Sequence, residues 1–314
     1  MQTKGAVIIG SGLIAKFHAN AVNASAKTTL VGVYDAVLER AEAFAKEFGC
    51  KAFSSLDDAL SAEGVDICLV ATPSGAHDEA VFAAARHKVN VLVEKPLTIT
   101  LERAQKMIDA CKEAGVQLGG IFQTRWDESF KNAKRKIESG ELGKITYASI
   151  RVPWWRDDEY YTKSAWHGTW AVDGGGALIN QSIHMVDWLV ALMPKVTDVK
   201  AFCATLAHPM ETEDTVSAAL RFEGGALGGV YAATSSYPGR GKFIEITGTK
   251  GTLVIDDDNG GSSAPDSFPY IGHQRCIEAF VDSLNGGEPY AIPGEEAIKS
   301  IELIERIYKD AGIR

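Results

Sequence analysis

Short apolar runs alternate with helical patterns through the first 122 residues of the chain. The apolar runs cover residues 6–10, 28–34, 65–71, 90–94 and 116–122, and helical spacing falls between them at 37–48, 77–86 and 101–114. These runs are apolar at nearly every position, which is typical of strands that helices cover on both faces. The alternation predicts a parallel, doubly wound sheet over residues 1–122.

Longer runs that alternate apolar and polar positions replace this pattern after about residue 143. They cover residues 145–155, 196–207, 215–225, 226–236, 242–249 and 251–256, and helices are expected at 130–139, 177–192, 274–284 and 295–308. Alternating strands joined by short turns are typical of an antiparallel sheet. The sequence therefore predicts an α/β protein with a Rossmann domain (1–122). A second α/β domain (123–314) with a large, mostly antiparallel open sheet follows, and its C-terminal helices are free to pack back on the first domain.

Composition and charge indicate which partners and which cell compartment the protein is suited to. The 314 residues carry a formal charge of −9, which disfavours nucleic acid and anionic lipid surfaces as partners. The chain has no N-terminal apolar signal and no apolar stretch of about 18 residues, so cytoplasmic residence is the expectation. Its five cysteines are scattered without a Cys-x-x-Cys pair, and we expect reduced thiols and no metal site.

A glycine-rich turn joins the first predicted strand to the first helix. It reads Gly10-Ser11-Gly12-Leu13-Ile14-Ala15, in the context that a dinucleotide-binding turn requires. Asp35 ends the second strand, 23 residues after Gly12, where a carboxylate accepts hydrogen bonds from ribose hydroxyls and repels a 2′-phosphate. The turn therefore predicts NAD rather than NADP as the cofactor. The alternative is a glycine-rich turn beside a solvated aspartate.

Polar residues also follow the next predicted strands. Thr72, Pro73, Ser74 and His77 come after the strand at 65–71, and Glu94-Lys95-Pro96 comes after the strand at 90–94. In α/β proteins, ligands bind at this carboxyl edge of the sheet. A lysine ending an apolar strand is suited to proton transfer with a substrate hydroxyl, and the alternative for Lys95 is a surface lysine.

The second domain has its own polar constellation. A triple-glycine turn at 174–176 opens the predicted helix at 177–192, on which Asn180 and His184 are four residues apart and share one face. Most other positions of this helix are apolar, so a satisfied core histidine is the alternative for His184.

Aromatic residues concentrate just upstream of this helix. Four tryptophans, Trp154, Trp155, Trp166 and Trp170, fall in the segments WWRDDEYY and WHGTW. Flat apolar rings interleaved with Arg156 and tyrosines fit a polyhydroxylated ring, and the alternative is an interface or core aromatic cluster.

The turn GSGLIA, the Glu94-Lys95-Pro96 segment and the segment GGGALINQSIHMVD together resemble the Gfo/Idh/MocA (glucose-fructose oxidoreductase, inositol dehydrogenase, MocA) family. The resemblance spans nearly the whole chain and implies a Rossmann domain, an open-sheet domain and a homodimer or homotetramer. It implies that Lys95 and His184 are the acid/base residues, and that Gln123 and Arg125 lie at the cofactor-side crossover. Asn180 departs from the family pattern, since many inositol-type members carry aspartate there and an amide cannot accept a proton.

We therefore expect NAD-dependent oxidation or reduction of a secondary hydroxyl or ketone on a sugar, glycoside or cyclitol. The alternatives are a glycosidase or epimerase that retains its NAD and works through a transient keto-sugar, and a non-catalytic NAD-binding protein. The catalytic residues expected are Lys95, His184 and Asn180. The cofactor-binding residues expected are Gly10, Ser11, Gly12, Leu13, Ile14, Asp35, Arg40, Thr72, Pro73, Ser74, His77, Glu94, Lys95 and Gln123. The substrate-binding residues expected are Arg125, Arg156, Tyr161, Trp166, Trp170, Asn180 and His184.

Overall fold

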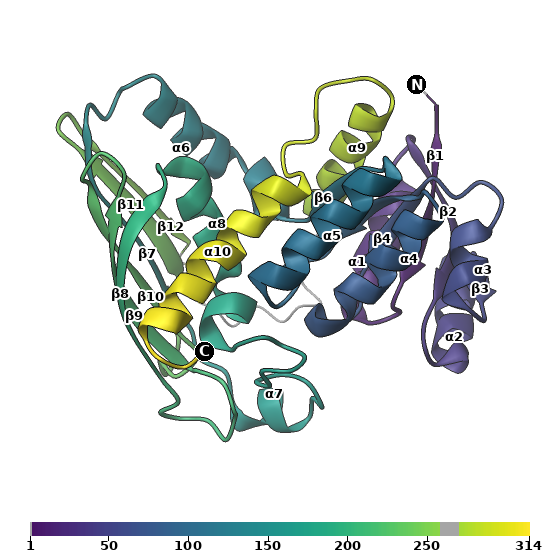
Figure 1. The fold of residues 1–314 in the computed structure, drawn as a ribbon, viewed down its shortest axis with the longest axis horizontal. Coiled ribbons are helices and arrows are strands. Elements are labelled where there is room, and N and C mark those ends of the chain that lie inside the picture. The colour runs from purple at the N-terminus through teal and green to yellow at the C-terminus, as the bar shows by residue number, and fades with distance from the viewer. Residues whose placement is uncertain (1, 258–269) are drawn as a thin grey trace. The chain divides into compact units, whose positions relative to one another are not determined.

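The computed structural model describes residues 2–257 and 270–314, which divide into two compact units (Figure 1). Unit 1 comprises the described residues up to Gln123 and those from Tyr270 to Ile298, and unit 2 comprises the remaining described residues. The segment from Tyr270 to Ile298, in the C-terminal part of the sequence, is grouped with the first 123 residues. In the part of the chain that the structure describes, no helix is both long and apolar enough to span a bilayer.

Unit 1 is built on a six-stranded parallel sheet. Its strands are β1 (Lys4–Ile9), β2 (Thr28–Tyr34), β3 (Lys51–Phe53), β4 (Ile67–Val70), β5 (Asn90–Val93) and β6 (Leu118–Gly120), in the order β3-β2-β1-β4-β5-β6. This order confirms the predicted doubly wound sheet, and it reverses direction between β1 and β4, where such sheets bind ligands. Strand β3 was not predicted, because a segment of three residues is too short to show a pattern of apolar and polar positions.

Helices and a 3-10 turn connect these strands. They are α1 (Leu13–Ala24), α2 (Leu38–Phe48), α3 (Leu56–Ser61), η1 (Ser74–Ala76), α4 (His77–Arg86), α5 (Leu101–Ala114) and α9 (Ile271–Leu284). The Thr100 hydroxyl caps α5 by accepting from the Arg103 N–H, and Gly115 ends it in the left-handed conformation. Helix α1 packs beside α9, so a C-terminal helix completes unit 1.

Unit 2 holds the second six-stranded sheet. Its strands are β7 (Ile145–Pro153), β8 (Val196–Ala204), β9 (Thr215–Phe222), β10 (Leu227–Ala233), β11 (Lys242–Gly248) and β12 (Thr252–Asp257), in the order β12-β11-β7-β10-β9-β8. Only the β7–β10 pair is parallel among the described pairs, which confirms the predicted, mostly antiparallel sheet. Burial alternates along β9, from Val216 to Phe222, because one face of the sheet is covered and the other is open.

The helix predicted at 177–192 is two elements rather than one, and the expectation of a single regular helix was wrong. A π-helical turn, η3 (Ala177–Gln181), precedes α8 (Ile183–Leu192). The Ser182 hydroxyl donates to the Ala177 carbonyl, and the Ala177 N–H donates to the Glu213 carbonyl outside the helix. A carbonyl from a distant segment thus accepts from the first N–H of η3, which has no acceptor within the helix, and a side chain five residues on bonds the first carbonyl.

Three further helices belong wholly or partly to unit 2. They are α6 (Glu128–Glu138), the short α7 (Asp158–Thr162) and α10 (Gly294–Asp310), and a 3-10 turn, η2 (Gln123–Trp126), begins at the last residue of the first segment of unit 1. Helix α10 begins in unit 1 and continues into unit 2 after Ile298.

Candidate functional site

The glycine-rich turn lies at the carboxyl end of β1, against the ends of two neighbouring strands. Gly10 has a φ of 98° and its N–H donates to the Tyr34 carbonyl of β2 at 2.8 Å. A Cβ atom at Gly10 would lie 2.7 Å from the carbonyl oxygen of Ala71, which follows β4. Both the backbone angle and this close approach require glycine at position 10.

Gly12 and the start of α1 form a cradle that the protein itself leaves open. A Cβ atom at Gly12 would meet nothing within 4 Å, and its φ of −71° suits any residue. No side chain caps α1, its first turn has no acidic residue, and Leu13 and Ile14 are 41% and 36% exposed. The uncapped N–H groups and the space at Gly12 fit the pyrophosphate of a dinucleotide.

Asp35 lies beside this turn and is bonded to it. One carboxylate oxygen accepts from the Ser11 N–H at 2.9 Å and from the Ser11 hydroxyl at 2.6 Å, while the other accepts from the Val37 N–H at 3.0 Å. The structure thus brings Ser11 and Asp35 together at the ends of β1 and β2, and lone pairs remain on the carboxylate for ribose hydroxyls. Arg40 lies further along, exposed on α2.

His77 connects the loops that follow β4 and β5. Its Nε2 lies 2.9 Å from the Thr72 carbonyl oxygen and its Nδ1 lies 3.0 Å from the Pro96 carbonyl oxygen. The ring is 1% exposed, and burial lowers the pKa of His77 although backbone hydrogen bonds oppose that shift. Its ring nitrogens are therefore engaged by backbone groups of the two loops.

Lys95 is half-buried directly after β5, and the peptide bond from Lys95 to Pro96 is cis. The Lys95 N–H donates to the carboxylate of the buried Glu94 at 3.1 Å. Thr72 Oγ1 and Gln123 Oε1 are among the buried polar atoms of unit 1 that have no hydrogen-bond partner among the described residues. Such atoms fit a site whose ligand supplies the missing bonds. The neighbouring Pro73 and Ser74 form the start of the η1 turn, with Ser74 buried.

In unit 2, Asn180 is bonded to a carboxylate that the sequence did not single out. Its amide nitrogen donates to Asp173 Oδ1 at 2.7 Å, and its amide oxygen accepts from the Gln181 side chain at 3.2 Å. Asp173 is 1% exposed and also accepts from the Gly168 N–H at 2.9 Å. A buried carboxylate thus lies beside Asn180, and its only sequence signal was an aspartate directly before three glycines. His184 is half-buried on α8.

Arg156 anchors part of the predicted aromatic cluster. Its guanidinium donates to the Gln181 amide oxygen at 2.7 Å and lies over the Trp154 and Tyr160 rings, 5.1 and 5.5 Å from their centroids. The Tyr160 hydroxyl accepts from the Gln181 amide at 2.7 Å, and its ring stacks on His167 at 4.3 Å. Burial raises the pKa of Tyr160 to about 12, so this phenol is neutral and holds its hydrogen bonds at physiological pH.

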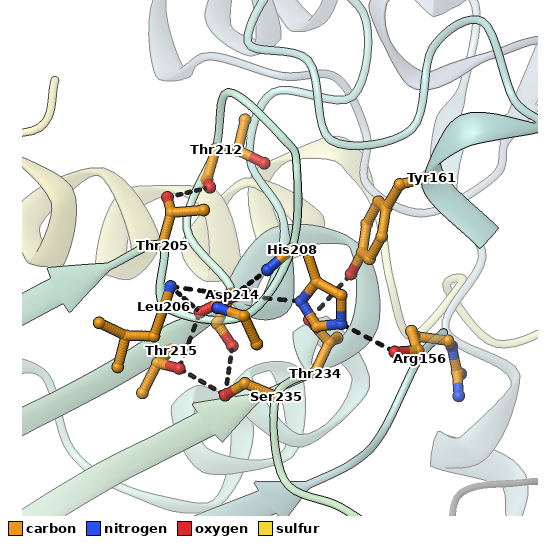
Figure 2. Close-up of polar contacts among 11 residues, drawn as sticks. Arg156, Tyr161, Thr205, Leu206, His208, Thr212, Asp214, Thr215, Thr234 and Ser235 are labelled. Carbon is orange, nitrogen blue, oxygen red and sulfur yellow. Dashed lines mark hydrogen bonds and ion pairs between the residues drawn. The ribbon is translucent and has the colours of Figure 1, made fainter. Parts of the chain in front are cut away.

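Tyr161 is buried, and its hydroxyl is bonded to another side chain of unit 2. It is 6% exposed, and the hydroxyl donates to Thr234 Oγ1 at 2.8 Å (Figure 2). Its ring lies at a hollow of about 460 Å³ within unit 2. The residues lining the hollow are Tyr161, Ser164, His167, Gly168, Thr169, His208, Pro209, Met210 and Glu211.

A buried histidine–aspartate pair supports this hollow (Figure 2). His208 Nδ1 lies 3.1 Å from Asp214, and its Nε2 lies 2.8 Å from the Arg156 carbonyl oxygen. Burial alone would raise the pKa of Asp214, but hydrogen bonds from the Ala207 and Leu206 N–H groups outweigh it and lower that pKa. The anion fixes the loop from Thr205 to Asp214 and, through His208, the backbone that carries Arg156. Sequence reasoning missed both residues because they meet only in the folded chain.

Arg125, Trp166 and Trp170 are engaged by other protein groups of unit 2. Arg125 forms a bidentate ion pair with Asp187 at 2.7 Å, and the two side chains are 9% and 0% exposed. The Trp170 indole N–H donates to the Glu211 carbonyl at 3.1 Å, and the Trp166 ring contacts the His167 ring at 4.0 Å between centroids. The structure thus places the two tryptophans close to the hollow and gives Arg125 a structural partner.

The Glu213 carboxylate accepts hydrogen bonds from backbone N–H groups at the start of η3. It accepts from the Gly176 and Leu178 N–H groups at 3.0 and 2.9 Å and from the Tyr308 hydroxyl at 2.8 Å. A Cβ atom at Gly176 would lie 2.2 Å from the Glu213 carbonyl oxygen, so glycine is required there. Burial raises the pKa of Glu213 to about 7, against the opposing hydrogen bonds.

This raised pKa predicts a pH-dependent stability. Between pH 4.5 and 7 the folded protein keeps a proton on Glu213 that the unfolded chain has released, so stability is lost as pH rises toward 7. The slope is about 1.4 kcal/mol per pH unit. In urea unfolding, the free-energy difference between wild type and Glu213→Gln should therefore fall by about 3 kcal/mol across this window. Glu223→Gln, at an exposed position, is the control, and a flat difference would contradict the raised pKa.

Comparison with known proteins adds family membership to this geometry. The profile "Oxidoreductase family, NAD-binding Rossmann fold" matches residues 4–122, and the profile "GFO/IDH/MocA C-terminal domain" matches residues 130–254. The chain is 32% identical to scyllo-inositol 2-dehydrogenase (NAD(+)) of Bacillus subtilis, over 79% of this chain and 72% of that protein. It is 27% identical to Myo-inositol 2-dehydrogenase of Thermotoga maritima, over 92% and 90% of the two chains.

A solved structure is similar over almost its full length. The WlbA dehydrogenase from Bordetella pertussis, in complex with NADH and UDP-GlcNAcA, matches with a TM-score of 0.91 and 33% identity, over 99% of this chain and 97% of that chain. The Rossmann sheet, the open second sheet and both family profiles agree with the resemblance found in the sequence. The chain therefore belongs to the Gfo/Idh/MocA family of oxidoreductases, whose first domain binds NAD in a Rossmann fold.

Proposed function

We propose that this protein catalyses the reversible, NAD-dependent oxidation of a secondary hydroxyl on a sugar, glycoside or cyclitol. The observation that carries the proposal is the open phosphate cradle at Gly12 with the Asp35 carboxylate bonded beside it. Proteins similar to this chain support the substrate class. Two are named as inositol dehydrogenases, and the structure of a third was solved with NADH and a nucleotide sugar.

We assign the following roles to residues of this chain. When bound, NAD+ accepts the hydride that leaves the substrate carbon. Lys95 and His184 take up the hydroxyl proton as the carbon–oxygen double bond forms, and they return it in the reverse direction. Asn180, held by Asp173, orients the hydroxyl.

The aromatic cluster of unit 2 supports a carbohydrate as the substrate. Arg156 lies over two aromatic rings, and Tyr161, Trp166 and Trp170 lie at or beside the hollow. Ring faces pack on the C–H face of a sugar, while Arg156 donates to its hydroxyls. Arg125 acts in this proposal by holding α8 through Asp187.

A panel assay tests the proposal. The protein is mixed with NAD+ and with myo-inositol, scyllo-inositol, glycosides or UDP-GlcNAcA, and reduced cofactor is followed by absorbance. One or more members should be oxidised, with a ketone as the product. Substrate turnover without net cofactor reduction would instead indicate a glycosidase or epimerase that recycles NAD. If the protein binds the cofactor but oxidises no member of the panel, the result would count against the proposal.

We propose NAD rather than NADP because the Asp35 carboxylate is bonded beside the phosphate turn, where it would accept from ribose hydroxyls and repel a 2′-phosphate. Asp35→Ser removes the charge and the two Ser11 hydrogen bonds, so the Kd for NAD+ should rise about 10-fold and the preference over NADP+ should disappear. Nucleotide titrations by fluorescence measure both affinities. Asp57→Ser, at an exposed site of unit 1, is the matched control. Equal binding of both nucleotides by the wild type would overturn the preference.

We also propose that the protein is a cytoplasmic homodimer or homotetramer. The open face of the second sheet supports self-association, because Tyr147, Phe202, Leu227 and Val254 are 39%, 84%, 52% and 55% exposed there. Exposed apolar side chains gathered on one sheet face mark an interaction surface.

A further inference from the structure

Three ionisable side chains from separate segments meet inside unit 1. His18 lies on α1, Glu94 follows β5 and His273 lies on α9, and they are 0%, 6% and 5% exposed. One oxygen of Glu94 lies 2.9 Å from His18 Nε2 and 3.2 Å from His273 Nε2. The two imidazole rings contact each other edge to face at 5.2 Å. Neither histidine has a part in the function proposed above.

The charges in this cluster follow from burial and hydrogen bonding. Burial lowers the pKa of His18, although the hydrogen bond to Glu94 opposes the shift, so this ring is neutral. Burial alone would raise the pKa of Glu94, but hydrogen bonds from His18 and His273 outweigh it and hold that pKa well below its usual range. Glu94 is therefore a buried anion stabilised by imidazole N–H donors.

The same three groups could also ligate a metal, because their ligand atoms lie within 4.8 Å of one another. Coordination through Nε2 would move each ring proton to Nδ1. Both Nδ1 atoms are buried and have no hydrogen-bond partner within residues 2–257 and 270–314. Ligating histidines normally donate that proton to an acceptor, and a buried N–H without one is costly. The hydrogen-bonded arrangement, with the proton on Nε2, fits these surroundings better.

The other oxygen of Glu94 faces the lysine. It accepts from the Lys95 N–H at 3.1 Å, and the Glu94 N–H donates to the Val70 carbonyl of β4 at 3.0 Å. On the C-terminal side of Lys95, His77 Nδ1 lies 3.0 Å from the carbonyl oxygen of the next residue, Pro96. Buried groups thus bond the Lys95 N–H and the backbone of both neighbouring residues, Glu94 and Pro96.

We propose that His18 and His273 are positioning residues, which orient the Glu94 carboxylate and thereby fix the backbone of Lys95. The inference rests on the proposed function, in which Lys95 moves the substrate proton. His18 also belongs to the helix whose uncapped N-terminus forms the phosphate cradle. The cluster therefore ties the pyrophosphate site and the lysine into one rigid frame, and α9 from the C-terminal part of the chain completes it.

Hydrogen exchange of the Lys95 amide tests the geometry without any substrate. His18→Leu and His273→Leu remove one donor each, so exchange at Lys95 should accelerate about 10-fold or more. His18→Gln and His273→Gln keep a donor at the Nε2 position, and their exchange should stay within about threefold of wild type. His87→Leu removes an exposed histidine–aspartate pair of the same unit and should change nothing at Lys95. Wild-type exchange in both leucine variants would overturn the proposal.

Kinetic measurements distinguish a loss of Lys95 positioning from a loss of folded protein. With an active substrate, the leucine variants should lose about 10-fold in kcat per folded site, with the KM for NAD+ within about twofold, and the glutamine variants should recover kcat. Folded sites are counted by the stoichiometry of NADH binding. A wild-type protein that oxidises nothing defeats the proposed function, whereas an active wild type with unchanged leucine variants defeats this inference alone.

Two more outcomes are decisive. One equivalent of zinc bound by the wild type, and lost in the histidine variants, would replace the positioning role with a metal site. If the leucine variants do not fold, His18→Asn and His273→Asn, whose amides are too short to reach Glu94, should show the same faster exchange. Unchanged exchange in those variants would also overturn the proposal.

Discussion

Replacing Lys95 by methionine should lower kcat for substrate oxidation by a factor of about 10²–10⁴, while the Kd for NADH stays within about twofold. Methionine keeps the length and apolar stem of the side chain, and it leaves the hydrogen bond from the residue-95 N–H to Glu94 in place. The loss should therefore fall on proton transfer rather than on cofactor binding. Stopped-flow absorbance of reduced cofactor and fluorescence titration with NADH measure the two quantities separately.

Two further variants identify the cause of that loss. Lys95→Arg keeps the positive charge, but a guanidinium does not release its proton near neutral pH, so kcat should stay almost as low as in Lys95→Met. Lys106→Met changes an exposed lysine of unit 1 and should have no effect. A Lys95→Met enzyme that keeps more than about a third of wild-type kcat would remove Lys95 from the proton-transfer role.

Much of the fold follows from local sequence patterns because the patterns have physical periods. β4 is apolar and buried at every position, β1 is buried from Gly5 to Ile9, and burial alternates along β9 of the second sheet. The failures have a tertiary cause. Strand β3 is three residues long, and the π-helical start of the predicted helix at 177–192 depends on Glu213, which is distant in the sequence.

The candidate site divides in the same way. The phosphate turn was predictable because its glycines and its aspartate fall at fixed places along one strand–helix–strand unit. His18, His273 and Asp173 were not, because each is defined by a partner from another segment. Residue type also failed to reveal that Arg125 and Tyr161 have their polar groups bound to other protein atoms.

Restoring the family's aspartate by Asn180→Asp should harm this protein rather than improve it. The new carboxylate would replace an amide that lies 2.7 Å from the Asp173 carboxylate, which is 1% exposed. Asp173 is buried and position 180 is half-buried, and two carboxylates at this distance do not readily ionise together, so the pair binds a proton and its pKa rises above that of a free carboxyl. Stability is then retained at low pH and lost as pH rises. The variant should lose about 2–4 kcal/mol of unfolding free energy at pH 8 and much less at pH 5, measured in urea.

The exchanged pair, Asp173→Asn with Asn180→Asp, isolates this cause. An amide at position 173 can accept from the Gly168 N–H and donate to a carboxylate at position 180, so the double variant should recover most of the stability at pH 8. Asp173→Asn alone leaves two amides facing each other and should cost about 1 kcal/mol. If kcat follows stability through this series, Asn180 serves to orient the hydroxyl. If the exchanged pair is more active than wild type, a carboxylate at position 180 can itself accept the substrate proton. Proton transfer would then involve position 180 as well as Lys95 and His184.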